Sequence, residues 1–308
     1  MRPDTWHLTE DIDDFHARAA DFLRSRPALH NTPLTVLEKW RTHPGAFVPG
    51  TVLFGRLESD GDTQAIFYRP ASRRLTLTPL SPERADSLAA QLAGLGHTLT
   101  GVTADHDTAT AFAEAWQGYT GATPTLPVRM HLYRLDALTP ATPHPDGHSR
   151  PVGEQDHEHL MRWCRELAAD LGEIVTINAE SWAGTRFAEK RYTFWQTPDG
   201  TPVSMAGLNP MTAGMVRVDP VYTPAHLRGR GYAAAVTTAV SRAALAAGAT
   251  EVVLFTDAGN PTSNALYQRL GYRRIADWAP YEFAFSTPEA GWKPSLSAFR
   301  CQLGLHQR

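Results

Sequence analysis

Residues 222–233 read YTPAHLRGRGYA, a glycine turn between an apolar, strand-like run and an alanine-rich run. Gly229 and Gly231 let the backbone turn tightly, so that consecutive N–H groups point to one place where a helix begins. Such a turn can hold a pyrophosphate. Taken alone, the same letters also fit an ordinary tight turn in which Arg228 and Arg230 are solvated surface charges.

The elements around the turn favour the phosphate-binding interpretation. Residues 216–222 are typical of a strand, and Pro220 predicts a bulge or an edge there because proline lacks an N–H group. After the turn, apolar residues recur at helical spacing until Gly248, which predicts the end of the helix. Residues 251–256 then predict a buried strand, joined to the first by this crossover helix.

A second short helix is predicted from Pro261 to Leu270, because Asn260 is a good N-cap and proline suits the first helical position. Asn260, Ser263 (or Asn264) and Tyr267 share one face of this helix. Asn260 could be only a cap, and Tyr267 only a half-buried core aromatic. The alternative is a polar stripe that faces the same crevice as the glycine turn.

These two motifs resemble those of the GCN5-related N-acetyltransferase (GNAT) family over residues 213–275. The family's pyrophosphate turn is written Gln/Arg-x-x-Gly-x-Gly/Ala, which residues 228–233 fit. Its next motif, an Asn followed by a small polar residue and a Tyr, is matched by Asn260, Ser263 and Tyr267. Two motifs in this order are much more specific than either alone.

The resemblance implies an α/β fold with a mixed GNAT-type sheet flanked by helices, and acetyl-CoA or another acyl-CoA as the acyl donor. It implies that Tyr267 is the general acid beside the thioester sulfur. It also implies that the cofactor is held by a set of strand, turn and helix residues, namely Val221, Tyr222, Thr223, Arg228, Gly229, Arg230, Gly231, Tyr232, Ala233, Asn260 and Ser263.

The chemistry is N-acetyl transfer by direct attack of an amine in a ternary complex. The amine must lose a proton, an oxyanion develops, and the thiolate leaves best when protonated. A backbone N–H near the strand bulge can serve the oxyanion. The carboxylates considered as base are Glu173, Glu180, Asp257 and Glu282. None is assigned, because carboxylates are more often solvated surface charges than bases, and a water relay is an alternative. His226 is expected at the surface, and no metal is expected, since the Cys/His spacing of a metal site is missing.

Composition fits an enzyme of the cytoplasm. With 308 residues, a net charge of −3 and no basic block, the chain gives no reason to expect nucleic acid or membrane as a partner. Cys164 and Cys301 are expected to be reduced thiols. The expected partner is a small-molecule amine, and the protein is expected to be a monomer or homodimer.

Four prolines in a segment without periodic apolar residues predict a linker at residues 137–151. The catalytic domain is then expected at 152–286, with a C-terminal extension at 287–308. The first 136 residues show a similar order of helices and strands, which predicts a tandem GNAT repeat; an unrelated α/β domain is the alternative. This copy is expected not to bind CoA, because Pro79 and Pro82 stand where the amides of a phosphate turn would be needed.

The acceptor is left open between a small amine, an aminoacyl or natural-product amine and a protein N-terminus, and the slightly acidic chain favours a cationic acceptor. Four aromatic residues precede the strand that is expected to bind the cofactor. They either shape the acceptor site or pack in the core, namely Trp163, Trp182, Tyr192 and Trp195. A different class of function is a non-catalytic acyl-CoA sensor, which would not need Tyr267 as an acid.

Overall fold

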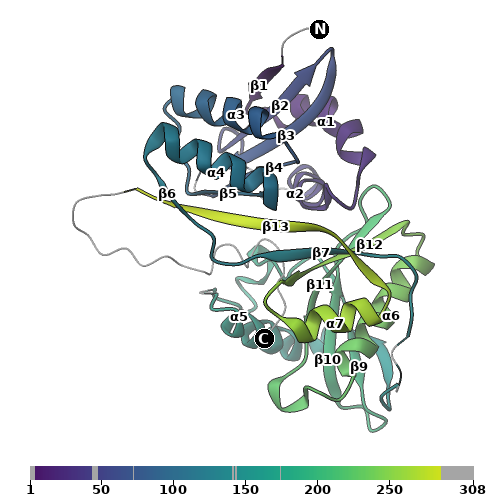
Figure 1. Cartoon of the computed structure of the whole chain (residues 1–308). Coiled ribbons are helices and arrows are strands. Elements are labelled where there is room, and N and C mark those ends of the chain that lie inside the picture. Colours follow the sequence, from purple (N-terminus) through teal and green to yellow (C-terminus); the bar gives the residue numbers. More distant parts are fainter. Residues whose placement is uncertain are drawn as a thin grey trace. The chain divides into compact units, whose positions relative to one another are not determined.

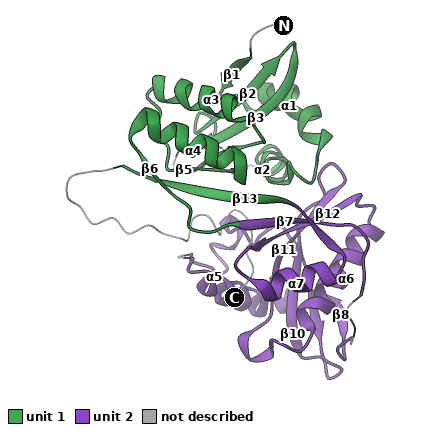
Figure 2. Cartoon of the chain, in the orientation of Figure 1, with its two compact units in different colours: residues 1–129, 276–293 green, residues 130–275, 294–308 purple. Residues whose placement is uncertain are grey.

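The computed structural model describes residues 4–43, 48–71, 73–140, 142, 144–173 and 175–285. The chain forms two compact units (Figures 1 and 2). Unit 1 comprises residues 1–129 and 276–293, and unit 2 comprises residues 130–275 and 294–308. The C-terminal extension expected at 287–308 and the second cysteine, Cys301, lie outside the described residues.

Unit 1 begins with a strand, followed by two helices, three strands, a helix, a strand, a helix and a short strand. Its elements are β1 (Thr5–Thr9), α1 (Ile12–Ser25), α2 (Asn31–Thr42), β2 (Val52–Ser59), β3 (Asp62–Pro70), β4 (Leu75–Leu77), α3 (Pro82–Gly94), β5 (Gly101–Asp105), α4 (His106–Thr120) and β6 (Thr123–Thr125).

Helices cover both faces of the unit 1 sheet, as the side-chain alternation of β3 shows. Ala65 and Phe67 pack against α3 and α4 in one core cluster. Ile66 and Tyr68 pack against α1 and α2 in another. Because side chains alternate across a strand, a run of buried residues in β3 predicts a sheet that is covered on both sides.

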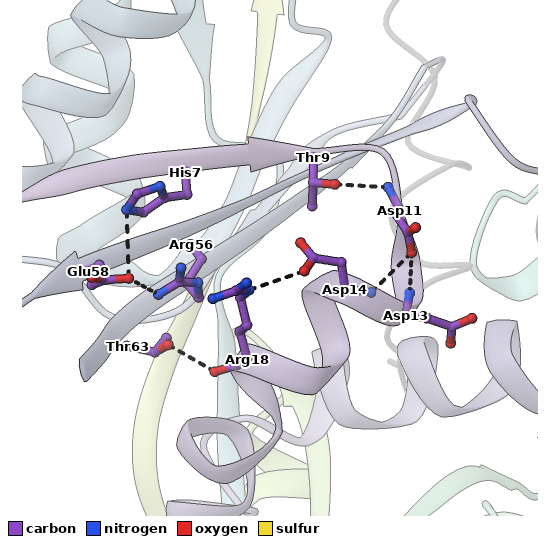
Figure 3. Close-up of polar contacts among 9 residues, drawn as sticks. All are labelled: His7, Thr9, Asp11, Asp13, Asp14, Arg18, Arg56, Glu58 and Thr63. Atoms are coloured by element: carbon purple, nitrogen blue, oxygen red, sulfur yellow. Dashed lines mark hydrogen bonds and ion pairs between the residues drawn. The ribbon is translucent and has the colours of Figure 1, made fainter. Parts of the chain in front are cut away.

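Polar contacts fix the first helix of unit 1 to the neighbouring strands (Figure 3). The Asp11 side chain caps α1 by accepting from the backbone N–H of Asp13 at 2.8 Å and of Asp14 at 3.0 Å. Thr63 donates to the carbonyl oxygen of Arg18 at 3.1 Å. Capping carboxylates satisfy helix N–H groups that have no partner in the helix, so Asp11 sets where α1 begins.

Unit 2 contains β7 (Met130–Leu135), β8 (His148–Pro151), α5 (His157–Asp170), β9 (Arg191–Gln196), β10 (Pro202–Leu208), β11 (Met215–Tyr222), α6 (Tyr232–Ala246), β12 (Glu251–Asp257) and α7 (Pro261–Arg269). Of these, β11, α6, β12 and α7 are the elements predicted around the glycine turn. The sheet order is β7-β12-β11-β10-β9-β8. Among the described strands of this unit, only β11 and β12 pair in parallel, so the sheet is mixed, as predicted.

Each half of the sequence supplies its last strand to the unit that the other half mainly forms. Residues 130–135 close the first half of the chain, yet β7 pairs with β12 in the sheet of unit 2. The final strand, β13 (Tyr272–Ala284), leaves unit 2 at Ile275, and its later residues pair with β5 and β6 in unit 1. These boundaries differ from the expected ones at 136 and 152, and part of the expected linker is strand β8, which pairs with β9.

A buried ion pair holds β13 in unit 1. The Arg74 guanidinium, just before β4, donates to the Glu282 carboxylate, and each side chain is only 8% exposed. Glu282 was considered as a catalytic base, and its place in unit 1 beside Arg74 gives it a structural role instead. Breaking a buried pair on one side leaves a charge without a partner, which is strongly destabilising.

We expect Glu282→Gln to lower the free energy of unfolding by about 3–5 kcal/mol, because the buried Arg74 guanidinium then loses the negative charge of Glu282. Urea unfolding followed by circular dichroism measures this. Asp277→Asn is the control on the same strand, since its pair with Arg129 is partly exposed at 3.1 Å and should cost less than about 1 kcal/mol. Equal effects of the two substitutions would contradict the structural role of the Arg74–Glu282 pair.

Candidate acyl-CoA site

Strands β11 and β12 pair over only three residues and then separate. The parallel ladder joins Met215, Val216 and Arg217 to residues 251–253, and it ends there in the described part of the chain. Beyond Val253, β12 continues to pair with β7 on its other edge. The inner edges of both strands therefore open toward their C-terminal ends, where an extended ligand could pair with the backbone as an added strand.

A bulge in β11 lies at this opening. Ala206 of β10 pairs with Val221, but Leu208 pairs with Val218, so β11 has one residue more than its partner. The bulge falls at Asp219 and Pro220, which confirms the bulge predicted at this proline. It also changes the alternation, so that Val216, Val218 and Val221 all belong to the same core cluster.

The glycine turn follows directly. Gly229 and Gly231 have φ angles of +78° and +81°, a conformation that glycine adopts without strain, and Gly231 is the N-cap of α6. The first N–H groups of α6 have no acceptor inside the helix. Tyr232 and Ala233 contribute two of these amides. The turn therefore presents backbone donors at the positive end of a helix, as the sequence predicted.

The two arginines of the turn make contacts within the protein. Arg228 donates through Nε to the carbonyl oxygen of Thr223 at 3.0 Å and through Nη2 to Asp170 of α5 at 2.8 Å. Arg230 is exposed, and its Nη2 lies 3.4 Å from the carbonyl oxygen of His226. Arg228 thus braces the loop before the helix, and the expected contacts of both arginines with phosphate stay a prediction.

The residues at the end of β11 are buried and fixed by hydrogen bonds. Tyr222 donates its hydroxyl to Glu166 of α5 at 2.8 Å, and burial, together with this carboxylate, raises the pKa of Tyr222. Ser204 donates to the carbonyl oxygen of Tyr222 at 3.0 Å and lies 2.8 Å from the Thr223 hydroxyl. The end of β11 is therefore held by contacts with α5 and β10, and β10 lies on the side of β11 opposite to β12.

Helix α7 begins as predicted. The Asn260 side chain accepts from the backbone N–H of Ser263 at 3.0 Å, and Pro261 occupies the first turn. Asn260 is 4% exposed, and its Nδ2 donates to no acceptor among the described residues. Asn260 is thus a cap, but the cap uses only its oxygen. The buried amide nitrogen still needs an acceptor, which fits a ligand carbonyl.

Tyr267 is 3% exposed and packs in the core cluster of unit 2, with its ring centroid 6.0 Å from that of Tyr272. Burial, assisted by Tyr272, raises the pKa of Tyr267, so the phenol remains protonated at neutral pH. The sequence left open whether this residue is a core aromatic or an acid. The structure shows the first, and the second stays a prediction.

The carboxylates considered as base have different surroundings. Glu173 is buried and forms a bidentate pair with Arg186, at 2.8 and 3.2 Å. Glu180 is exposed. Asp257 ends β12 and accepts from the N–H of Gly259 at 2.7 Å. His226 is exposed, as expected. Asp257 is the carboxylate of this set that lies at the open ends of the strands.

The four aromatic residues proposed for the acceptor side are mostly core residues. Trp163, Tyr192 and Trp195 are between 3% and 6% exposed, and the Tyr192 hydroxyl donates to the carbonyl oxygen of Phe187 at 2.8 Å. Trp182 is partly exposed and packs edge-on against His157 with ring centroids 5.0 Å apart. Trp182 therefore remains the one of these four that could contact an acceptor directly.

A buried charge network that the sequence analysis missed joins the segment after α5 to the bulge. Arg186 pairs with Glu173 and lies 3.7 Å from Asp219, which also accepts from Lys190. The side chains of all four are at most 8% exposed. Burial alone would raise the pKa of Asp219, but Lys190, Arg186 and Arg217 outweigh it and hold the pKa far below its usual value. Burial lowers the pKa of Lys190 to about 8.

Residues 155–272 match the model of the Acetyltransferase (GNAT) family. This segment contains the bulge, the glycine turn and α7, so the chain carries a GNAT domain and is an acyltransferase by class. A comparison with curated protein sequences gives no significant match.

Solved structures of the same fold cover most of the chain. A GCN5-related N-acetyltransferase from Sphaerobacter thermophilus is 19% identical with a TM-score of 0.58, over 90% of this chain and 94% of that one. A GNAT-family acetyltransferase from Colwellia psychrerythraea is 11% identical with a TM-score of 0.57, over 91% and 100%. A tandem GNAT protein from the clavulanic acid biosynthesis pathway is 14% identical with a TM-score of 0.53, over 94% and 100%.

These likenesses confirm the predicted α/β fold and are consistent with two GNAT-like units. Within the described residues, a search for helices long and apolar enough to span a membrane finds none.

We expect Asp219→Asn to lower the free energy of unfolding by about 3 kcal/mol or more, because the buried Lys190 loses the carboxylate that accepts its hydrogen bond, and Arg186 loses one of its two nearby carboxylates. Urea unfolding followed by tryptophan fluorescence measures this. Glu158→Gln, an exposed carboxylate of α5, is the control and should change stability by less than about 0.5 kcal/mol. A similarly small effect of Asp219→Asn would show that the network does not stabilise unit 2.

Proposed function

We propose that unit 2 transfers an acetyl group from acetyl-CoA to the amine of a small molecule by direct attack in a ternary complex. The observation that carries this proposal is the opening between β11 and β12, which ends beside the glycine turn and the buried Nδ2 of Asn260. When bound, acetyl-CoA supplies an activated thioester. Its extended arm would pair with the edge at Val221, Tyr222 and Thr223.

The glycine turn would bind the pyrophosphate through backbone amides. The N–H groups of residues 229–233 stand at the start of a 15-residue helix, where negative charge is stabilised by the helix dipole. Arg230 is exposed beside them and would add charge. Arg228 would act mainly by fixing the loop, since its guanidinium already binds Thr223 and Asp170.

Asn260 and Tyr267 would act along the arm. The buried Nδ2 of Asn260 would donate to a carbonyl oxygen of the arm, and the adjoining Ser263 lies at the same helix start. Tyr267 lies two turns further along α7, and its protonated phenol would stabilise the departing thiolate. The acceptor amine would approach from the side of the bulge, where a backbone N–H can stabilise the charge that develops on the thioester oxygen.

We expect Tyr267→Phe to lower kcat at least tenfold, about 1.4 kcal/mol of transition-state stabilisation, with little change in acetyl-CoA affinity. Thiol release from acetyl-CoA, measured with a panel of primary amines, aminoacyl compounds and peptides, reads out kcat. Tyr272→Phe is the control, because its hydroxyl is also buried but lies 2.7 Å from Ser241. Unchanged turnover in Tyr267→Phe would remove this residue from the mechanism. Tight acetyl-CoA binding by the wild-type protein without release across the panel would favour a sensor.

We expect Gly231→Asp to weaken acetyl-CoA binding at least tenfold, because a carboxylate at the N-cap of α6 repels the pyrophosphate. Calorimetry measures the affinity. Gly248→Asp is the matched control, since Gly248 also has a positive φ, +92°, but follows the opposite end of the same helix. Equal affinities of the Gly231 variant and the wild type would refute the assignment of the phosphate turn.

A further inference from the structure

Two buried polar atoms near the C-terminal end of β12 have no hydrogen-bond partner within the residues that the structure describes. Thr256 is completely buried, and its hydroxyl has no partner among the described residues; the same holds for Nδ2 of Asn260, four residues later. Buried polar groups in folded proteins are nearly always hydrogen-bonded, so each exception needs an explanation. Two exceptions so close in the chain suggest one common cause.

The place of Thr256 in the sheet points to that cause. Val252 and Leu254 belong to the same core cluster as Tyr267. Because side chains alternate along a strand, Thr256 lies on the same face as these two residues. It also lies beyond Val253, where the ladder between β11 and β12 ends. Thr256 is therefore on the open part of β12, on the face that carries Tyr267.

We propose that Thr256 is a further binding residue for the acyl donor, and that its hydroxyl forms a hydrogen bond with an amide of the pantetheine arm. This inference rests on the proposed function. A threonine hydroxyl both donates and accepts, whereas the Nδ2 of Asn260 only donates. The arm contains amide carbonyl and N–H groups, so Asn260 can bind a carbonyl oxygen and Thr256 can bind either kind of group. The ligand thereby supplies partners that the protein alone does not.

If the Thr256 hydroxyl binds a ligand, its removal should change ligand affinity but not the stability of the free protein. A hydroxyl without a partner contributes no hydrogen bond to the free protein, so replacing it by a methyl group of the same size should not destabilise the fold. The same replacement should cost affinity for a ligand that needs the hydroxyl. Stability and binding are therefore expected to respond differently to Thr256→Val.

The test measures acetyl-CoA affinity by calorimetry and thermal stability for the full chain and its variants. We expect Thr256→Val to weaken acetyl-CoA binding roughly tenfold, with a melting temperature equal to or above that of the wild type. Thr256→Ser, which keeps the hydroxyl, should bind within about threefold of the wild type. Affinity for the adenosine bisphosphate portion of CoA, which lacks the arm, should not change in either variant.

Thr103→Val is the matched control, because Thr103 of β5 is a buried threonine of unit 1 whose hydroxyl also has no hydrogen-bond partner in the described part of the chain. It should not affect acetyl-CoA affinity.

Equal binding by Thr256→Val and the wild type would overturn the role of Thr256 and leave the proposed function intact. If Thr256→Val does not fold, the comparison of Thr256→Ser with Thr256→Ala isolates the hydroxyl, and equal binding by those two would overturn it. A wild-type protein that does not bind acetyl-CoA would overturn both proposals.

Discussion

The early end of the ladder between β11 and β12 is the constraint on which the site depends. A parallel pair that continued to Tyr222 would use the inner backbone groups of both strands and leave none for a ligand. Two features lie on the outer sides of this opening. On one side, the bulge at Asp219 and Pro220 bends β11 against β10. On the other, β7 pairs with β12 from Val253 to Asp257, which holds the strand through its open part.

The exchange of strands connects this opening to the architecture of the whole chain. The strand that holds β12 comes from the end of the first half of the sequence, and the second half in turn supplies β13 to the sheet of unit 1. Each sheet is therefore completed by a strand from the other half of the sequence. A site in unit 2 thus depends on residues outside the segment that matches the GNAT family. The first half of the chain thus contributes a strand to the sheet that contains the proposed site.

The sequence could predict the parts of the site that depend on local rules. The glycine turn, the bulge at Pro220 and the cap at Asn260 are each set by a few neighbouring residues, and the structure has all three. Strand exchange could not be predicted, because periodicity identifies a strand but not its partner. Glu282 shows the consequence: its partner Arg74 is 208 residues away in sequence. The network of Glu173, Arg186, Lys190 and Asp219 was missed because charged residues are usually exposed, and nothing local marks the exceptions.

The two units differ in the segment that joins the strand of the parallel pair to the next helix. Unit 1 also has a parallel pair, in which β4 and β5 join at Leu75 and Thr76. Beyond it, the Thr108 hydroxyl accepts from the N–H of Leu80 at 2.8 Å and lies 3.3 Å from its carbonyl oxygen. The next helix then begins with Ser81 and Pro82, and the proline has no N–H to offer a phosphate. The chain itself thus binds the backbone N–H and carbonyl groups of Leu80, just before this helix. Since both units have helices on a mixed sheet, the two strand-to-helix junctions differ through these local hydrogen bonds and the glycine turn, not through the fold.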